Sequence, residues 1–131
     1  MNREDVTVKA ARELGIKPKM VKKAMFEQSE RIKKKPARLF HATHIDNFDS
    51  IKKNGILPHA FYGQVYLCED PLQCLRFIKK PCVIFEVDTK QLDIKKMVYS
   101  RDHSKRVYNF DVYAYYKTIF PSALKDWEAL K

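Results

Sequence analysis

The sequence has 131 residues, 45% of them hydrophobic, which predicts one domain with a buried core and at most a small appendage. No apolar run approaches the ~18 residues of a membrane-spanning helix, and the first residues lack a signal-peptide pattern, so an intracellular, cytoplasmic protein is expected. The three cysteines have no Cys-x-x-Cys spacing, which indicates reduced structural thiols rather than a disulfide framework or a zinc site.

The net charge of +10 is unevenly distributed along the chain. Residues 1–38 contain 12 Lys and Arg against 5 Asp and Glu, a balance of +7, whereas residues 39–131 contain 14 against 11, a balance of +3. A basic excess concentrated in the N-terminal third favours a polyanion as the partner. The alternative is a lysine-rich surface that only keeps the protein soluble.

Residues 1–37 are expected to form a basic helical appendage and linker. One helix ends at Gly15, and Pro18 suits the first turn of a second helix, with Ile32 on its apolar side. Residues 10–21 resemble the Ala-Ala-x-x-Leu-Gly-Ile-x-x-x-x-Val pattern of helix-turn-helix segments, whose second helix enters the major groove. A helical hairpin packed on the following domain fits this pattern equally well. The basic residues expected to contact nucleic acid are Lys17, Lys19, Lys22, Lys23, Lys33, Lys34, Lys35 and Arg38.

After the linker the sequence predicts a strand, a polar turn and a helix. Alternation along the strand places His41 and Thr43 on one face and Ala42 on the other. The helix is expected to begin with Asp46 as its N-cap and to end with Gly55 in the left-handed conformation. His41 and Thr43 thus lie just before a helix N-terminus, which is a common place to hold a polar ligand.

The rest of the chain alternates short strands with short helical segments. A helix begins at Pro71, with Glu69 or Asp70 as its cap, and ends at Pro81. The other expected elements are strands at 64–68, 82–88, 97–99 and 108–116 and a closing helix at 121–130. This order predicts an α+β fold with a mixed or mostly antiparallel sheet. The three glycines are scattered, which excludes Rossmann and P-loop folds.

Three polar side chains lie at unusual positions on the predicted strands: His41, Tyr66 and Asp111. Alternation in the last strand puts Asp111 on the face of Tyr113 and opposite Val112. A carboxylate within an aromatic strand has low β-propensity and needs a reason. Each residue alone is explained as well by packing or by surface exposure, but their order along the chain makes them candidates for one site.

Three motifs of this chain resemble the ADP-ribosyltransferase fold. The first is His-x-Thr at 41–43, followed by Asn-Phe-x-x-Ile-x-x-x-Gly-Ile at 47–56. The second is Val-Tyr-Leu at 65–67 before an acidic helix start, and the third is Asp111 in a strand with Pro121 soon after it. The resemblance is closest to DarT-type DNA ADP-ribosyltransferases, with poly(ADP-ribose) polymerases and tRNA 2′-phosphotransferases as relatives. It implies a domain at 38–131 with a split, mixed or antiparallel sheet and short helices.

The resemblance also implies that NAD is the co-substrate. His41 would hydrogen-bond a ribose hydroxyl of NAD, supported by Thr43, and the backbone at Ala42 would receive the nicotinamide amide. Tyr66 would stack on the nicotinamide ring. Asp111 would stabilise the oxocarbenium character that develops when the nicotinamide–ribose bond breaks. The catalytic residues implied are therefore Asp111, His41 and Tyr66.

The leading hypothesis is an NAD-dependent ADP-ribosyltransferase that modifies nucleic acid, with DNA favoured and with no metal and no membrane partner. A first alternative is the NAD-dependent removal of an RNA 2′-phosphate, for which Arg38, Arg101 and Arg106 are the candidate arginines. A second is a non-catalytic nucleic-acid-binding module on a degenerate transferase fold, because Asp111 stands where such enzymes usually carry glutamate. A protein acceptor also stays open.

Overall fold

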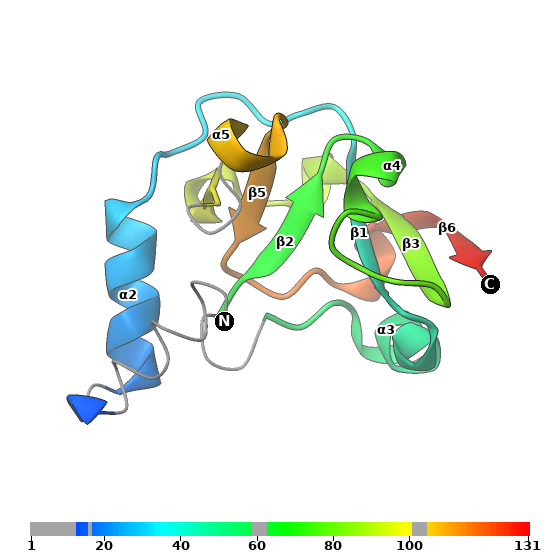
Figure 1. The fold of residues 1–131 in the computed structure, drawn as a ribbon, viewed down its shortest axis with the longest axis horizontal. Helices are drawn as coiled ribbons and strands as arrows, with labels where there is room; N and C mark the ends of the chain where they lie inside the picture. Colours follow the sequence, from blue (N-terminus) through cyan, green and yellow to red (C-terminus); the bar gives the residue numbers. More distant parts are fainter. Residues whose placement is uncertain (1–12, 16, 59–62, 101–104) are drawn as a thin grey trace.

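The computed structural model describes residues 13–15, 17–58, 63–100 and 105–131. These residues form an α+β fold around one six-stranded sheet in the order β4-β5-β2-β1-β3-β6 (Figure 1). Every neighbouring pair of strands is antiparallel, which confirms the mostly antiparallel sheet expected from the sequence. The strands are β1 (Leu39–His44), β2 (Val65–Cys68), β3 (Cys82–Val87), β4 (Met97–Tyr99), β5 (Val112–Tyr115) and β6 (Leu124–Leu130).

The helical segments are short, and several are single turns. The α-helices are α2 (Pro18–Gln28), α3 (Phe48–Asn54), α4 (Pro71–Cys74) and α5 (Lys105–Tyr108). The 3-10 helices are η1 (Ile45–Asn47), η2 (Thr89–Gln91), η3 (Ile94–Lys96) and η4 (Pro121–Ala123). Among the helices of the described residues, none has the length and apolar character needed to cross a bilayer.

The two faces of the sheet carry separate hydrophobic clusters, because side chains alternate along each strand. The main core holds Leu39 of β1 and Phe85 of β3, both fully buried, and it is covered by Ile51 of α3. The second cluster, on the opposite face, holds Phe40 of β1 and is covered by Cys74 of α4. The alternation predicted for the first strand therefore matches the burial of its apolar residues.

The sheet is nearly divided between β1 and β2. These strands share one register pair, Phe40↔Cys68, whereas β1 and β3 pair from Leu39↔Val87 to His44↔Cys82. Beyond Phe40 the two strands part, and the main-chain groups of β2 that would face β1 need other partners.

The predicted helix around Phe48 is present, but its beginning differs from the expectation. Asp46 does not act as its N-cap, because η1 precedes α3 and the Nδ1 atom of His44 accepts a hydrogen bond from the Asp46 amide. Gly55 ends α3 with φ 83°, as predicted. A Cβ atom at this position would collide with the carbonyl oxygen of Ile119, so glycine is required for both reasons.

The closing helix predicted at 121–130 is wrong. Only Pro121–Ala123 are helical, as η4, and the remaining residues form β6 along the edge of β3. Leu124, Trp127 and Leu130 have helical spacing, but the main-chain groups of β3 gain a full ladder of partners when this segment is extended. Tertiary pairing thus overrides the local pattern.

The strand predicted at 108–116 is shorter than expected. Tyr108 ends α5, and Asn109 has a positive φ of 63°, so the chain turns before it enters β5 at Val112. Asp111 therefore lies immediately before the strand rather than within it. Asp70 caps α4 by accepting from the Leu72 amide, as predicted, but α4 ends at Cys74, well before the predicted end.

Of the predicted N-terminal hairpin, the first helix lies mostly outside the described residues. The second begins at Pro18, as predicted, and ends at Gln28. Ile32 lies beyond that helix and is buried in the main core, which corrects its predicted place. The boundary at residue 37 stays a prediction.

Candidate active-site pocket

A pocket of about 130 Å³ lies beside the point where β1 and β2 part. For comparison, an engineered apolar cavity of about 150 Å³ accepts benzene, so this pocket has room for one planar ring. Its walls come from β1, β2, β5, α4 and the turn that follows α4: His41, Ala42, Tyr66, Cys68, Cys74, Phe77, Ile78 and Val112. The lining is mainly apolar, with the imidazole and the phenol as the ring-bearing polar groups.

His41 is held across the opening between the two strands. Its Nδ1 atom is 2.8 Å from the carbonyl oxygen of Tyr66, and because a carbonyl oxygen only accepts, Nδ1–H is the donor. Burial lowers the pKa of His41, although the hydrogen bond to Tyr66 opposes this shift. The imidazole is therefore neutral at pH 7, and its Nε2 atom carries a lone pair that can accept a hydrogen bond from a ligand hydroxyl.

Tyr66 and Ala42 also line the pocket. Tyr66 is half-buried on β2 and lies on the face opposite the buried Val65 and Leu67, which confirms the predicted alternation. Ala42 is buried on β1 opposite Ile84 of β3. The structure thus brings His41, Ala42 and Tyr66 to one pocket from two strands.

Thr43 is not among the pocket-lining residues. Its Oγ1 atom accepts a hydrogen bond from Nδ2 of Asn47 at 2.8 Å. This bond ties the end of β1 to η1 and so fixes the turn that follows the strand. Its predicted support of His41 toward NAD stays a prediction.

Asp111 is also absent from the pocket wall. Val112, the first residue of β5, lines the pocket, whereas Asp111 precedes the strand and does not. Burial raises the pKa of Tyr99, and the nearby Asp111 carboxylate raises it further. Burial likewise raises the pKa of Tyr113, with the Glu69 and Asp111 carboxylates adding to the effect. Asp111 therefore shares its surroundings with Glu69 and two tyrosines.

Two thiols in the pocket wall were missed by the sequence motifs. Cys68 and Cys74 are buried and hydrogen-bonded to each other, and Sγ of Cys74 also lies 3.6 Å from the Phe40 carbonyl oxygen. The bond to Cys68 and burial raise the pKa of Cys74, so it stays a neutral thiol. The described residues include no group of three or more His, Cys, Asp or Glu side chains suited to a metal ion.

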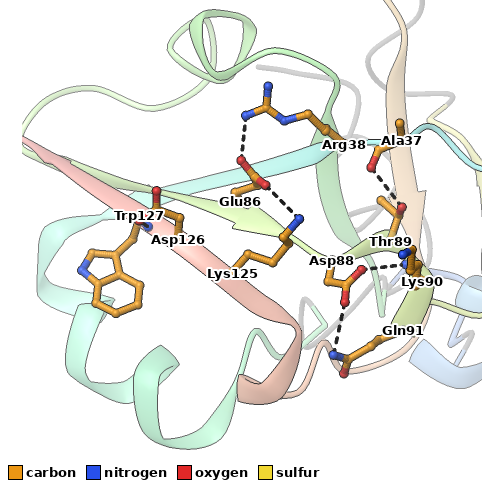
Figure 2. A network of polar contacts seen from close by, with 10 residues as sticks. All are labelled: Ala37, Arg38, Glu86, Asp88, Thr89, Lys90, Gln91, Lys125, Asp126 and Trp127. Carbon is orange, nitrogen blue, oxygen red and sulfur yellow. Dashed lines mark hydrogen bonds and ion pairs between the residues drawn. The ribbon is translucent and has the colours of Figure 1, made fainter.

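The predicted nucleic-acid contacts are distributed over α2 and the linker. Lys17, Lys23, Lys33 and Lys34 are exposed, while the side chains of Lys19 and Lys22 lie outside the described part of the structure. Arg38 donates to Oε1 of Glu86 at 2.7 Å, and Lys125 lies 3.6 Å from the other carboxylate oxygen (Figure 2).

The arginines of the phosphotransferase alternative do not line the pocket. Arg106 is exposed on α5, Arg38 is paired with Glu86, and Arg101 lies outside the described residues. In comparisons with known proteins, no family model matches this chain, and no curated protein matches it either.

Proposed function

We propose that this protein is an NAD-dependent ADP-ribosyltransferase that modifies nucleic acid. The observation that carries the proposal is the pocket at the junction of β1 and β2, where His41, Ala42 and Tyr66 come together. The near division of the sheet at this junction agrees with the split sheet that the resemblance implies.

The residues of the pocket fit the nicotinamide end of NAD. The volume of about 130 Å³ suits one flat ring, and the Tyr66 phenol supplies an aromatic face for stacking. A neutral His41 offers Nε2 as an acceptor for a ribose hydroxyl, because Nδ1–H is already donated to Tyr66. Bound NAD would supply a ribose carbon that becomes electrophilic as nicotinamide leaves.

The carboxylate that stabilises this developing positive charge is assigned to Asp111. The absence of Asp111 from the pocket lining favours a second candidate function, a nucleic-acid-binding module that does not catalyse transfer. The two functions differ in whether label from NAD reaches a nucleic acid. The basic balance of +7 in residues 1–38 supports a nucleic-acid partner for both.

The experiment compares the wild type with Tyr66→Ala and Tyr99→Ala, two partly buried strand tyrosines of which only Tyr66 lines the pocket. Ligand at ~100 times its dissociation constant adds about 2.7 kcal/mol to the free energy of unfolding. Millimolar NAD should therefore raise the melting temperature of the wild type and of Tyr99→Ala, but not that of Tyr66→Ala. No shift in the wild type would remove NAD from the function.

Labelled NAD, offered with separate pools of DNA, RNA and protein, then identifies the acceptor. Transfer to DNA or RNA supports the proposed enzyme. An NAD shift without transfer to any pool would leave the binding module as the better account, and transfer to protein alone would replace the nucleic-acid acceptor.

A further inference from the structure

The linker after α2 lies along the segment that carries η2 and η3. Nη1 of Arg31 donates to the carbonyl oxygen of Lys95 at 3.1 Å, and Nζ of Lys35 donates to the carbonyl oxygen of Leu92 at 2.8 Å. Oγ1 of Thr89 donates to the carbonyl oxygen of Ala37 at 3.3 Å (Figure 2). Successive linker residues thus meet the segment in reverse order, so the two run side by side in opposite directions.

This arrangement joins two groups of basic residues that are more than fifty positions apart in the sequence. We define the composite basic surface by the seven basic residues of the two segments: Arg31, Lys33, Lys34, Lys35, Lys90, Lys95 and Lys96. All except Lys35 are exposed. The linker is held both by these hydrogen bonds and by Ile32, which is buried in the main core.

The carboxylates within this surface are occupied by the backbone. Oδ1 of Asp88 accepts from the Lys90 amide at 3.1 Å, and Oδ1 of Asp93 accepts from the Lys95 amide at 3.0 Å. These bonds cap η2 and η3. Among the residues that the structure describes, none of the seven basic side chains forms an ion pair with a carboxylate. Their charge is therefore available to an external anion.

The aromatic ring within the surface is already covered. The Arg31 guanidinium carbon lies 3.8 Å from the centroid of the Phe26 ring, and Nζ of Lys96 lies 5.7 Å from it. These two cations already contact the ring that a nucleobase would need for stacking. The surface is therefore suited to phosphates rather than to base stacking.

From these contacts we propose that the composite basic surface binds the phosphate backbone of nucleic acid, with Lys90, Lys95 and Lys96 as contacts additional to those of the linker. The inference rests on the proposed function for its biological setting, since it names the surface that holds the acceptor. Binding is sequence-independent and electrostatic, so its affinity falls steeply as the salt concentration rises.

The test compares two triple variants that change the net charge equally. Lys90→Gln, Lys95→Gln and Lys96→Gln remove the η2–η3 contribution but keep the main-chain acceptors that hold the linker. The matched control is Lys53→Gln, Lys79→Gln and Lys80→Gln, three exposed lysines on α3 and before β3. Each protein is titrated with labelled single-stranded DNA, duplex DNA and RNA of about 20 nucleotides at several salt concentrations.

The η2–η3 variant should bind about 10-fold or more weakly at low salt, with the slope of log K against log[salt] reduced by about 3, one unit for each lost phosphate contact. The control should keep the wild-type slope. Equal losses in both variants, or no loss in the first, would overturn the assignment of the surface. Poly-glutamate that displaces the nucleic acid at equal charge concentration would overturn the choice of nucleic acid as the partner.

These titrations contain no NAD. A protein that fails the NAD test can still bind nucleic acid through this surface, and a protein that passes it can fail here, so the two failures are distinguishable. Circular dichroism of both variants shows whether a loss of binding accompanies a loss of fold. If the triple variant misfolds, the single variant Lys95→Gln is tested in its place. Its salt slope should be reduced by about 1, and an unchanged slope would overturn the proposal.

Discussion

β1 pairs with β3 along its whole length but with β2 at one position only. On the β3 side, the ladder satisfies the main-chain groups, and the side chains of Leu39 and Phe85 are completely buried in the main core. On the β2 side, the imidazole of His41 takes the Tyr66 carbonyl oxygen that a ladder would otherwise satisfy. One strand therefore joins a regular, densely paired region to an opening that holds a pocket.

The two sides of β1 thus have different roles. Pairing with β3 stabilises the fold, while the missing pairing with β2 leaves room for a ring-sized ligand beside a side chain that is fixed by one hydrogen bond. Substitutions on the two sides should consequently differ in what they change: the free energy of unfolding on one side and ligand-dependent behaviour on the other.

The largest effect is expected from Phe85→Ala on the paired side. Phe85 is fully buried, and its ring stacks on Phe48 with centroids 6.0 Å apart. Truncation of such a residue removes about 3–5 kcal/mol from the free energy of unfolding, measured by urea denaturation. Phe120→Ala, at a phenylalanine that is 66% exposed, is the control and should change it by less than about 0.5 kcal/mol.

If Phe85→Ala does not fold, Phe85→Leu serves as the milder variant, with an expected cost of up to about 1.5 kcal/mol. A cost for Phe85 no greater than that for Phe120 would contradict the assignment of the main stability to the paired side.

The next largest effect concerns Asp111, which stands before β5 on the other side of the junction. Asp111→Asn keeps the shape but removes the charge, so it should slow transfer from NAD by about 10²-fold while it preserves the NAD-induced thermal shift. Glu69→Gln is the control, because Glu69 is the other carboxylate near Tyr113. Full turnover by Asp111→Asn would show that the carboxylate of the reaction has been misassigned.

Much of the local structure was predictable because its causes are local. The β-branched and aromatic runs marked β1 to β4, and Gly55 marked the end of α3 through its left-handed backbone. The pairing of β6 was not predictable in this way, since the spacing of Leu124 and Trp127 favours a helix and the partner strand lies elsewhere in the sequence.

The site was predictable in part for the same reason. His41 and Tyr66 were found because their motifs are short and lie on well-marked strands. The place of Asp111 depends on the turn at Asn109, whose positive φ is not encoded in the alternation of apolar and polar residues. Cys74 enters the pocket only because α4 packs over β1, a long-range contact that no short motif encodes.

A smaller effect is expected from His41, on the open side of β1. His41→Ala removes the hydrogen bond from Nδ1 to the Tyr66 carbonyl oxygen, which should lower the free energy of unfolding by about 1–3 kcal/mol. His41→Gln retains an N–H donor and should recover part of this loss. Equal destabilisation by the two variants would show that the hydrogen bond is not what holds this position.

The pH dependence of stability provides a second measurement of the role of His41. Burial lowers the pKa of His41 below its ordinary value of 6.5, so the unfolded chain takes up this proton first as the pH falls. The contribution to stability is complete above pH 6.5 and decreases as the pH falls toward the folded pKa. His41→Gln should therefore make the stability flatter between pH 7 and pH 5, whereas an unchanged slope would contradict a lowered pKa of the His41 imidazole.

The smallest effect is expected at the ion pairs that Glu86 of β3 forms with Arg38, which precedes β1, and with Lys125 of β6. The hydrogen bond from Arg38 lowers the pKa of Glu86, and Lys125 adds to the shift (Figure 2). Because the Arg38 side chain is 65% exposed, water screens the pair, and Arg38→Met should cost less than about 1 kcal/mol at pH 7.

The lowered pKa of Glu86 stabilises the fold at pH values above 4.5, the pKa in the unfolded chain. This contribution is lost as the pH falls through the pKa of the folded state. The difference in urea midpoint between Arg38→Met and the wild type should therefore shrink as the pH falls below 4.5. Lys125→Met, which removes the more distant cation, should have a still smaller effect. A difference that does not change with pH would mean that Arg38 acts instead by covering the Phe40 ring, whose centroid lies 5.1 Å from its guanidinium carbon.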